Sequence, residues 1–296
     1  MDSLTSRDQI LGSYRLTRQI TRGNATYIWE AIKLGGTERF VIKVLDEKNR
    51  SSKDEMMQLK HEYEVAHQLS HPNVIKVFEL NVSNPSFIVL EVFSVLNLKQ
   101  ALRQDRQRLL VEYANIVTQC AAGLNHLHEK GWVHCDVKPD NFLLNDDNQV
   151  KLIDLSIAKR AATGFFARMF GGQKIIRGTR SYMSPEQIRG KPMDTRADIY
   201  SFGCMIYELL AGKAPYTANS PNELLTKHLT APIPTVQVHN DNVTPEMNEF
   251  LRTLMAKEVE KRPKTMGDVL QTFKALRIFR SPPRPSGSGD KAKTKS

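Results

Sequence analysis

The segment that most constrains this chain is His134-Cys135-Asp136-Val137-Lys138-Pro139-Asp140-Asn141. A stretch with a helical pattern precedes it, and the short apolar strand 142–144 follows it. A second strand-like run, 150–153, ends at Asp154. Two such strands predict one hairpin with two adjacent loops. The polar side chains expected on these loops are Asp136, Lys138, Asn141 and Asp154.

These four side chains form the set that phosphoryl transfer requires. The reaction needs little covalent chemistry from the protein but much positioned charge. A carboxylate must lie near the attacking hydroxyl, a cation near the transferred group, and metal ions on the phosphates.

The segment resembles the catalytic loop of protein kinases, H-R-D-x-K-x-x-N, followed by their metal-binding D-F-G. The resemblance implies that Asp136 orients the substrate hydroxyl and accepts its proton, and that Lys138 steadies the transferred group. It also implies that Asn141 and Asp154 hold Mg²⁺, with Mn²⁺ as an alternative. Further family signatures follow in order over residues 14–275, which disfavours a chance polar turn.

A second charged pair is expected earlier in the chain. Val41-Ile42-Lys43 resembles the family's V-A-I-K strand, which makes Lys43 the clamp on the α- and β-phosphates of ATP. Glu62 falls where the family's helix glutamate lies, counting back from the helix breaker 71–73. Glu64 is the competitor, on another face of the same helix.

The resemblance places the adenine base between two lobes. Leu90 would be the gatekeeper, and the hinge would use the Glu91 carbonyl and the Phe93 amide. Core packing is an alternative role for Ile28 and Leu143, and both roles are compatible. The residues implied to bind ATP are Ile20, Gly23, Ile28, Lys43, Glu91, Phe93, Asn97 and Leu143.

The fold class implied is α+β, the two-lobed protein kinase fold. We expect a small β-rich N-lobe with one main helix over residues 14–93 and a larger, mostly helical C-lobe over 94–279. An extension, 1–13, precedes them, and a disordered basic tail, 280–296, follows. The residue patterns predict a helix over 54–70, a strand over 74–80 and an amphipathic helix over 111–129. The apolar pattern of 196–211 predicts a buried helix.

The substrate class also leaves marks in the sequence. Residues 178–186 resemble the end of an activation segment, which disfavours a small-molecule kinase. Lys138 and Thr179 are similar to serine/threonine rather than tyrosine kinases, and 178–188 looks most like bacterial members. Glu186 and Arg262 are expected to form a buried structural pair. The resemblance thus implies an ATP-dependent kinase acting on protein serine and threonine.

Three departures from the family are visible. The loop that should read G-x-G-x-x-G is 21–26, where only Gly23 remains. A hairpin is still expected here, but with a looser grip on phosphate. D-F-G is Asp154-Leu155-Ser156. Cys135 replaces an arginine that pairs in many members with a loop phosphate, whose usual position here is Ile175. We therefore expect activity that does not depend on activation-loop phosphorylation.

Two alternatives remain open. The altered loops favour an impaired pseudokinase that acts as a nucleotide-binding scaffold, whereas the complete set of charged residues opposes it. The apolar and basic segment 163–172 is expected either to dock a partner or second copy of the chain, or to fold back on the C-lobe.

Composition narrows the partners. The net charge is +10, but the tail from Ser281 contributes three of these charges and the rest are dispersed, which favours a solvated basic surface over a nucleic-acid site. The three cysteines lack metal or disulfide spacing. No apolar run approaches the ~20 residues of a membrane span. A cytoplasmic location is therefore expected.

Overall fold

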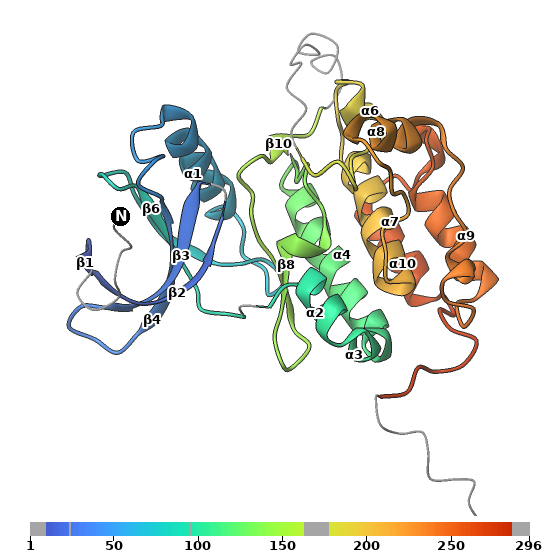
Figure 1. The fold of residues 1–296 in the computed structure, drawn as a ribbon, viewed down its shortest axis with the longest axis horizontal. Coiled ribbons are helices and arrows are strands. Elements are labelled where there is room, and N and C mark those ends of the chain that lie inside the picture. Colours follow the sequence, from blue (N-terminus) through green and yellow to red (C-terminus); the bar gives the residue numbers. More distant parts are fainter. Residues whose placement is uncertain (1–9, 24, 95, 163–177, 286–296) are drawn as a thin grey trace, which may run out of the picture.

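The computed structural model describes residues 10–23, 25–94, 96–162 and 178–285, and these form two lobes (Figure 1). The smaller lobe holds a sheet and the helix α1 (Lys53–Ala66), and the larger lobe is mostly helical. The expected two-lobed α+β architecture is confirmed. The segment 163–172, Ile175 and the tail beyond 285 lie outside the described residues.

The N-lobe sheet is antiparallel with the strand order β1-β2-β3-β4-β6-β5. The strand expected from Val74 begins at Val77, because Val74 and Ile75 pair with Leu152 of the C-lobe instead. The strands are β1 (Ile10–Leu11), β2 (Tyr14–Arg22), β3 (Thr26–Lys33), β4 (Arg39–Leu45), β5 (Val77–Asn81) and β6 (Phe87–Leu90).

Strand alternation decides where Lys43 points. Ile42 and Val44 lie in an apolar cluster with Trp29 and Phe87 on one face of the sheet. Successive side chains of a strand point to opposite faces. The side chain of Lys43 therefore projects from the other face, toward the lobe junction.

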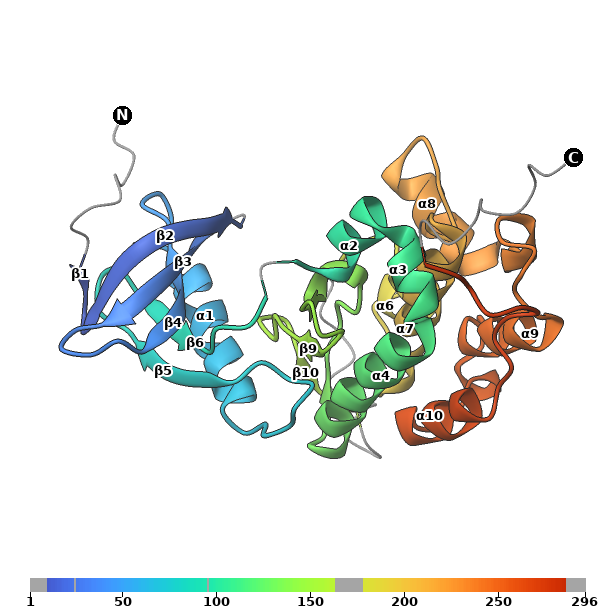
Figure 2. The same cartoon turned by 90° about the horizontal axis from the view of Figure 1, so that it is seen from below.

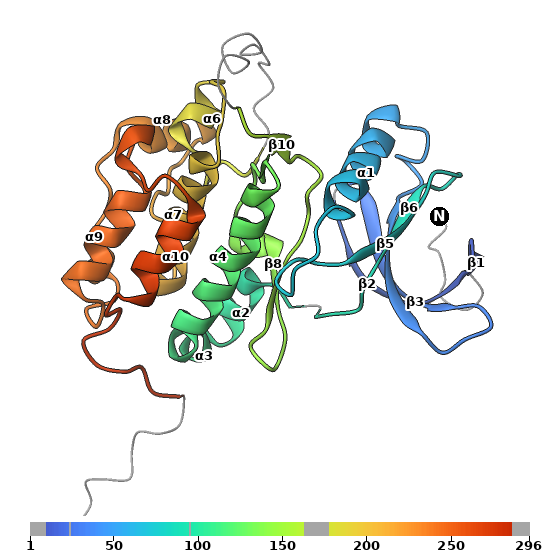
Figure 3. The same ribbon diagram turned by 180° about the vertical axis from the view of Figure 1, so that it is seen from behind.

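Helix α1 begins at Ser52, whose side chain accepts a hydrogen bond from the Glu55 amide. It packs against β5 and β6 through Leu59 and Val65 (Figure 3). The predicted helix to residue 70 ends at Ala66, because bonds spanning three residues tighten the chain before Pro72.

The C-lobe is built around α7, in which residues 197–211 are all buried, as its apolar pattern predicted. The single helix expected over 111–129 is divided at Glu112, where α3 ends and α4 begins. The helices are α2 (Leu98–Gln104), α3 (Arg106–Val111), α4 (Tyr113–Glu129), α6 (Pro185–Ile188), α7 (Arg196–Ala211), α8 (Pro221–Thr230), α9 (Pro245–Leu254) and α10 (Met266–Lys274).

Two small sheets face the junction between the lobes (Figure 2). Strands β8 (Phe142–Leu144) and β9 (Val150–Leu152) form the predicted hairpin. Strands β7 (Trp132–Val133) and β10 (Lys159–Arg160) pair alongside. The single-turn helix η1 (Pro139–Asn141) precedes β8, and η2 (Val236–Val238) and η3 (Val259–Lys261) lie farther on. The loops expected to carry the chemistry therefore lie at the lobe junction.

Both ends of the described chain contact the lobes. Strand β1 pairs with β2, so the sheet starts within the expected extension. The amide of Arg280 donates to the Asn242 carbonyl at 2.7 Å, and Gln107 contacts the Arg284 carbonyl. Over the described ranges, no helix is long and apolar enough to cross a membrane.

Candidate active site

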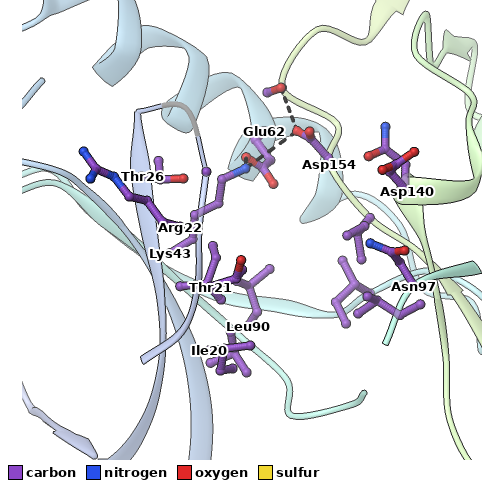
Figure 4. Close-up of a pocket in the computed structure, with 18 of the residues that line it drawn as sticks. Ile20, Thr21, Arg22, Thr26, Lys43, Glu62, Leu90, Asn97, Asp140 and Asp154 are labelled. Carbon is purple, nitrogen blue, oxygen red and sulfur yellow. Dashed lines mark hydrogen bonds and ion pairs between the residues drawn. The ribbon is translucent and has the colours of Figure 1, made fainter. Parts of the chain in front are cut away.

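A cavity of about 730 Å³ opens between the lobes (Figure 4). The sheet supplies its roof, and the β8–β9 hairpin and the start of α2 supply its floor. Its lining includes every residue implied to bind ATP: Ile20, Gly23, Ile28, Lys43, Glu91, Phe93, Asn97 and Leu143.

The connection between the lobes is braced by Glu91. Its side chain accepts from the Lys76 amide at 2.7 Å and from the Lys151 amino group at 2.8 Å. Its own amide donates to the Lys76 carbonyl. These bonds leave the Glu91 carbonyl as the group expected for the base. Lys151 was not expected at this site, because nothing in the sequence links β9 to the hinge.

Lys43 lies between two carboxylates at the back of the cavity (Figure 4). Its Nζ is 2.6 Å from Glu62 Oε2 and 3.6 Å from Asp154 Oδ1. Glu62 is buried, whereas Glu64 makes an exposed pair with Lys60. Of the two glutamates left open by the sequence, the structure brings Glu62 to Lys43.

Burial opposes ionisation of all three side chains. Attraction between opposite charges outweighs burial for Lys43 and Asp154, whereas burial keeps the pKa of Glu62 above its ordinary value. The carboxylates of Glu62 and Asp154 raise the pKa of Lys43 above its ordinary value. Although burial acts against ionisation, Lys43 and the Ser156 hydroxyl lower the pKa of Asp154 to about 2. Lys43 is therefore a cation at neutral pH, and it links Glu62 of the N-lobe to Asp154 of the C-lobe.

The catalytic loop converges on Asp136. Its Oδ1 accepts from the Thr179 amide at 2.7 Å, and its Oδ2 accepts from Lys138 Nζ at 2.6 Å. Lys138 also donates to the Thr179 hydroxyl at 2.7 Å. Asn141 donates its side-chain amide to the Asp136 carbonyl at 2.8 Å. Three residues of the catalytic loop and Thr179, 43 residues after Asp136, therefore share one hydrogen-bond network.

Asp198 at the start of α7 fixes the backbone of this loop. Its carboxylate accepts from the amides of His134 (2.6 Å) and Cys135 (2.9 Å), and from His128 Nε2 (2.8 Å). Cys135 is held at φ +68°, a left-handed conformation that is uncommon for residues other than glycine. His128 carried no motif signal, since its partner lies 70 residues away.

Asn141 and Asp154 fit a divalent cation such as Mg²⁺. Because the Asn141 amide nitrogen is bonded to Asp136, its oxygen is left for a metal, and both residues line the cavity. Carboxylate and amide oxygens are the ligands that Mg²⁺ prefers. Among the residues placed by the structure, no group of three or more His, Cys, Asp or Glu could hold a metal alone. Mg²⁺ commonly takes its other ligands from substrate phosphates and water.

Comparison with known proteins agrees with the function that this geometry suggests. Residues 14–273 match the protein kinase domain family. The chain belongs to this family.

Several bacterial kinases are similar to this kinase domain. It is 28% identical over 281 residues to serine/threonine-protein kinase PknA of Mycobacterium tuberculosis, covering 93% of this chain and 64% of that protein. It is 28% identical over 259 residues to a probable serine/threonine-protein kinase of Clostridium acetobutylicum, covering 87% and 39%. It is 30% identical over 219 residues to PknB of Mycobacterium leprae, covering 72% and 35%. The chain thus spans between about a third and two thirds of the length of these relatives.

The phosphate loop of this kinase domain still forms a tight turn. The Gly23 amide donates to the Thr26 carbonyl at 2.8 Å. Arg22 lies 3.5 Å from Asp46 and over the Tyr27 ring, and its guanidinium points away from Asp154 (Figure 4). A Cβ on Gly23 would lie 2.9 Å from Thr26 Oγ1, so a larger residue at this position would have to displace that hydroxyl. The hairpin expected despite the missing glycines is present.

The D-L-S segment shows how its two substitutions are accommodated. Leu155 is buried in the main core, as expected for a replacement of phenylalanine. Asp154 adopts φ +62°, and the Ser156 hydroxyl donates to its Oδ1 at 2.7 Å. The serine therefore adds a contact that a glycine could not make.

Cys135 lies in an apolar cluster where many kinases have an arginine. Its neighbours are Val133 and Ala197, with Ile157, Ala161 and Met193 packed around them. Burial raises the pKa of its thiol. The Cys135 carbonyl accepts from Gln187 Nε2 at 2.8 Å, which ties the catalytic loop to α6. Nearby, the expected buried pair of Glu186 and Arg262 is confirmed at 2.7 Å.

Proposed function

We propose that this domain is an active kinase that transfers the γ-phosphoryl group of ATP to serine and threonine hydroxyls of proteins. The observation that carries the proposal is the Lys43–Glu62–Asp154 bridge across the cavity, next to the Asp136–Lys138–Thr179 network. Both arrangements consist of positioned charge, which dominates this chemistry.

Each side chain has a role in the proposed reaction. Asp136 accepts the proton of the substrate hydroxyl as its oxygen attacks the γ-phosphorus and ADP leaves. Lys138 and Lys43 offset charge on the transferred group and on the phosphates that remain. Asp154 and Asn141 would hold Mg²⁺, which supplies charge neutralisation on the phosphates.

The second candidate is a nucleotide-binding scaffold with little or no transfer. The observation that favours it is the phosphate loop, which retains only Gly23 of its three glycines. Against it stands the hydrogen-bonded catalytic loop, because a scaffold has no need of a carboxylate held beside Lys138.

Incubation with Mg²⁺ and γ-labelled ATP separates the two. We expect the domain to label itself or a generic basic protein on serine and threonine, and Lys43→Met to abolish labelling while leaving the melting temperature nearly unchanged. A wild-type protein that binds ATP but transfers no label would support the scaffold. Label on tyrosine would contradict the substrate class.

We also infer that activity does not depend on phosphorylation of the activation segment. Cys135 supplies no cation for a phosphate, its neighbours in the cluster are apolar, and Gln187 braces the same loop with a neutral bond. Phosphatase treatment should leave the initial rate within about threefold, whereas a tenfold loss, about 1.4 kcal/mol of barrier, would reveal another phosphate socket.

The proposal also covers the substrates, the cellular location and self-association. The proposed substrates are proteins. The dispersed positive charge disfavours nucleic acid, and the activation-segment residues 178–186, which contact Asp136 through Thr179, disfavour small molecules. The three cysteines are free and buried, which supports a reducing, cytoplasmic location. Self-association through 163–172 concerns residues outside those described.

A further inference from the structure

Helix α1 contacts the C-lobe through the residue beside its glutamate. His61 Nε2 lies 2.7 Å from the Ala158 carbonyl, four residues after Asp154. A carbonyl can only accept, so His61 must donate through Nε2–H. This bond links the helix that carries Glu62 to the segment that carries Asp154.

The His61 ring also packs on the catalytic-loop side of the junction. It meets Trp132 edge to face, with ring centroids 5.7 Å apart. On the same indole, the Arg160 guanidinium lies 4.0 Å from the ring centroid and donates to the Lys130 carbonyl at 3.0 Å. Trp132 belongs to β7, which leads directly into His134.

These contacts join α1 to β7 and to the chain just before β10. Figure 1 shows α1 of the N-lobe facing the chain that leads to β10. Strand β10 pairs with β7, so the chain after Asp154 is already fixed to the start of the catalytic loop. Helix α1 belongs to the other lobe, and His61 ties it to this pair of strands. Because Glu62 is the next residue, withdrawal of α1 from Ala158 would also move Glu62 away from Lys43.

We propose that His61 is a positioning residue that fastens α1 to the C-lobe and so sets the Lys43–Glu62 ion pair. The inference rests on the proposed kinase activity. The clamp uses only unmodified side chains, which suits a domain whose Cys135 replaces the arginine used elsewhere to order the site through phosphate. His61 would thus help to order the site without an arginine–phosphate contact.

Two substitutions separate the hydrogen bond from packing. His61→Phe keeps a ring against Trp132 but loses the donor, whereas His61→Gln keeps a donor. We expect His61→Phe to lower kcat about tenfold, with the KM for ATP changed by less than about threefold. His61→Gln should restore most of the rate. Lys60→Ala, on the exposed side of the same helix, is the matched control and should be unaffected.

A double-mutant cycle tests whether His61 acts through its neighbour. In a Glu62→Gln background the ion pair is already gone, so His61→Phe should cost almost nothing further in kcat. Coupled residues are non-additive in this way, and independent ones are additive. The same loss in both backgrounds would overturn the proposal, as would a wild-type rate in His61→Phe.

A readout independent of activity uses the two tryptophans of the chain. In a Trp29→Phe background, Trp132 reports on the cover that α1 provides. His61→Phe should make Trp132 more accessible to acrylamide than it is in the unsubstituted histidine or glutamine forms. Equal quenching in all three would overturn the clamp. Absence of phosphotransfer by the wild type would instead contradict the proposed function and leave this test standing.

Discussion

Ser156 donates its hydroxyl to Asp154 Oδ1 at 2.7 Å, so the residue that replaces the family's glycine holds the carboxylate assigned to the metal. The contact fixes one of the two oxygens of a side chain whose backbone is already at φ +62°. The serine in place of the family's glycine therefore adds a hydrogen bond that restrains the Asp154 side chain.

Ser156→Gly is expected to weaken the response to Mg²⁺ although it restores the family motif. Without the hydroxyl, Asp154 must be ordered by the metal itself, so the half-saturating Mg²⁺ concentration should rise by about threefold or more, typical of losing a partner of a metal ligand. Ser156→Thr should keep the bond. Titration of Mg²⁺ at saturating ATP measures the effect, and an unchanged or lower half-saturation in Ser156→Gly would refute it.

Glu62→Gln and Glu64→Gln should behave very differently. Glu62 is buried on Lys43, so loss of its charge leaves the Lys43 ammonium without its nearest partner, and kcat should fall by about a hundredfold, as for lost preorganised charge. Glu64 is exposed, and its substitution should leave the rate nearly unchanged. Steady-state kinetics of the two proteins decides. Equal losses would show that the helix as a whole, not Glu62, is what matters.

The apolar cluster around Cys135 should resist a return to arginine. Cys135→Arg introduces a guanidinium among Val133, Ala197 and Met193, and the free energy of unfolding should fall by about 2 kcal/mol. Cys135→Ala keeps an apolar group and should cost less than about 1.5 kcal/mol. Urea unfolding measures both. A stabilised Cys135→Arg protein would indicate a carboxylate or phosphate partner that the cluster does not suggest.

Lys257 should make stability depend on pH above neutrality. Burial is the main cause that lowers the pKa of Lys257 to about 8, although its Nζ donates to the Tyr216 hydroxyl at 2.9 Å and the His228 carbonyl at 2.9 Å. Lys257 Nζ also lies 3.3 Å from the Tyr200 hydroxyl. The charge of Arg262 lowers the pKa of Lys257 further, whereas Cys204 raises it.

The direction of this pH dependence follows from the protons that Lys257 binds in the folded and unfolded states. Between pH 8 and 10.5 the unfolded chain keeps the Lys257 proton that the folded chain has released, so the contribution of this lysine to stability increases with pH across that window. Comparison with Lys257→Met cancels the other titrating groups. The stability of the wild type relative to this variant should rise from pH 8 to 10.5. A constant or falling difference would contradict the lowered pKa.

The sequence was sufficient to predict the site residues that belong to recognisable motifs. The spacing around Asp136 and Asp154 predicted their hairpin, and the resemblance at Val41-Ile42-Lys43 implied that Lys43 contacts the nucleotide phosphates. Helix ends were less certain: α1 stops at Ala66 rather than near residue 70, because a tightened last turn, not the apolar period, ends it.

Contacts between distant residues that belong to no motif were beyond sequence reasoning. Lys151 reaches Glu91 across 60 residues, and His61 reaches Ala158 across 97. A lysine on a strand or a histidine on a helix carries no local signal of such a partner, because the partner is defined only when the lobes are packed. The site's motif residues could be named in advance, but the bonds that brace them could not.

The proposed phosphoryl transfer depends most directly on Asp136. The most direct test of this role compares the wild type with Asp136→Asn in phosphate incorporation from γ-labelled ATP, with nucleotide affinity and the thermal melt measured alongside. Because the amide keeps the shape but cannot accept the hydroxyl proton, we expect transfer below about 1% of wild type, with affinity and melting temperature nearly unchanged. Activity above a few per cent of wild type in Asp136→Asn would contradict the assignment.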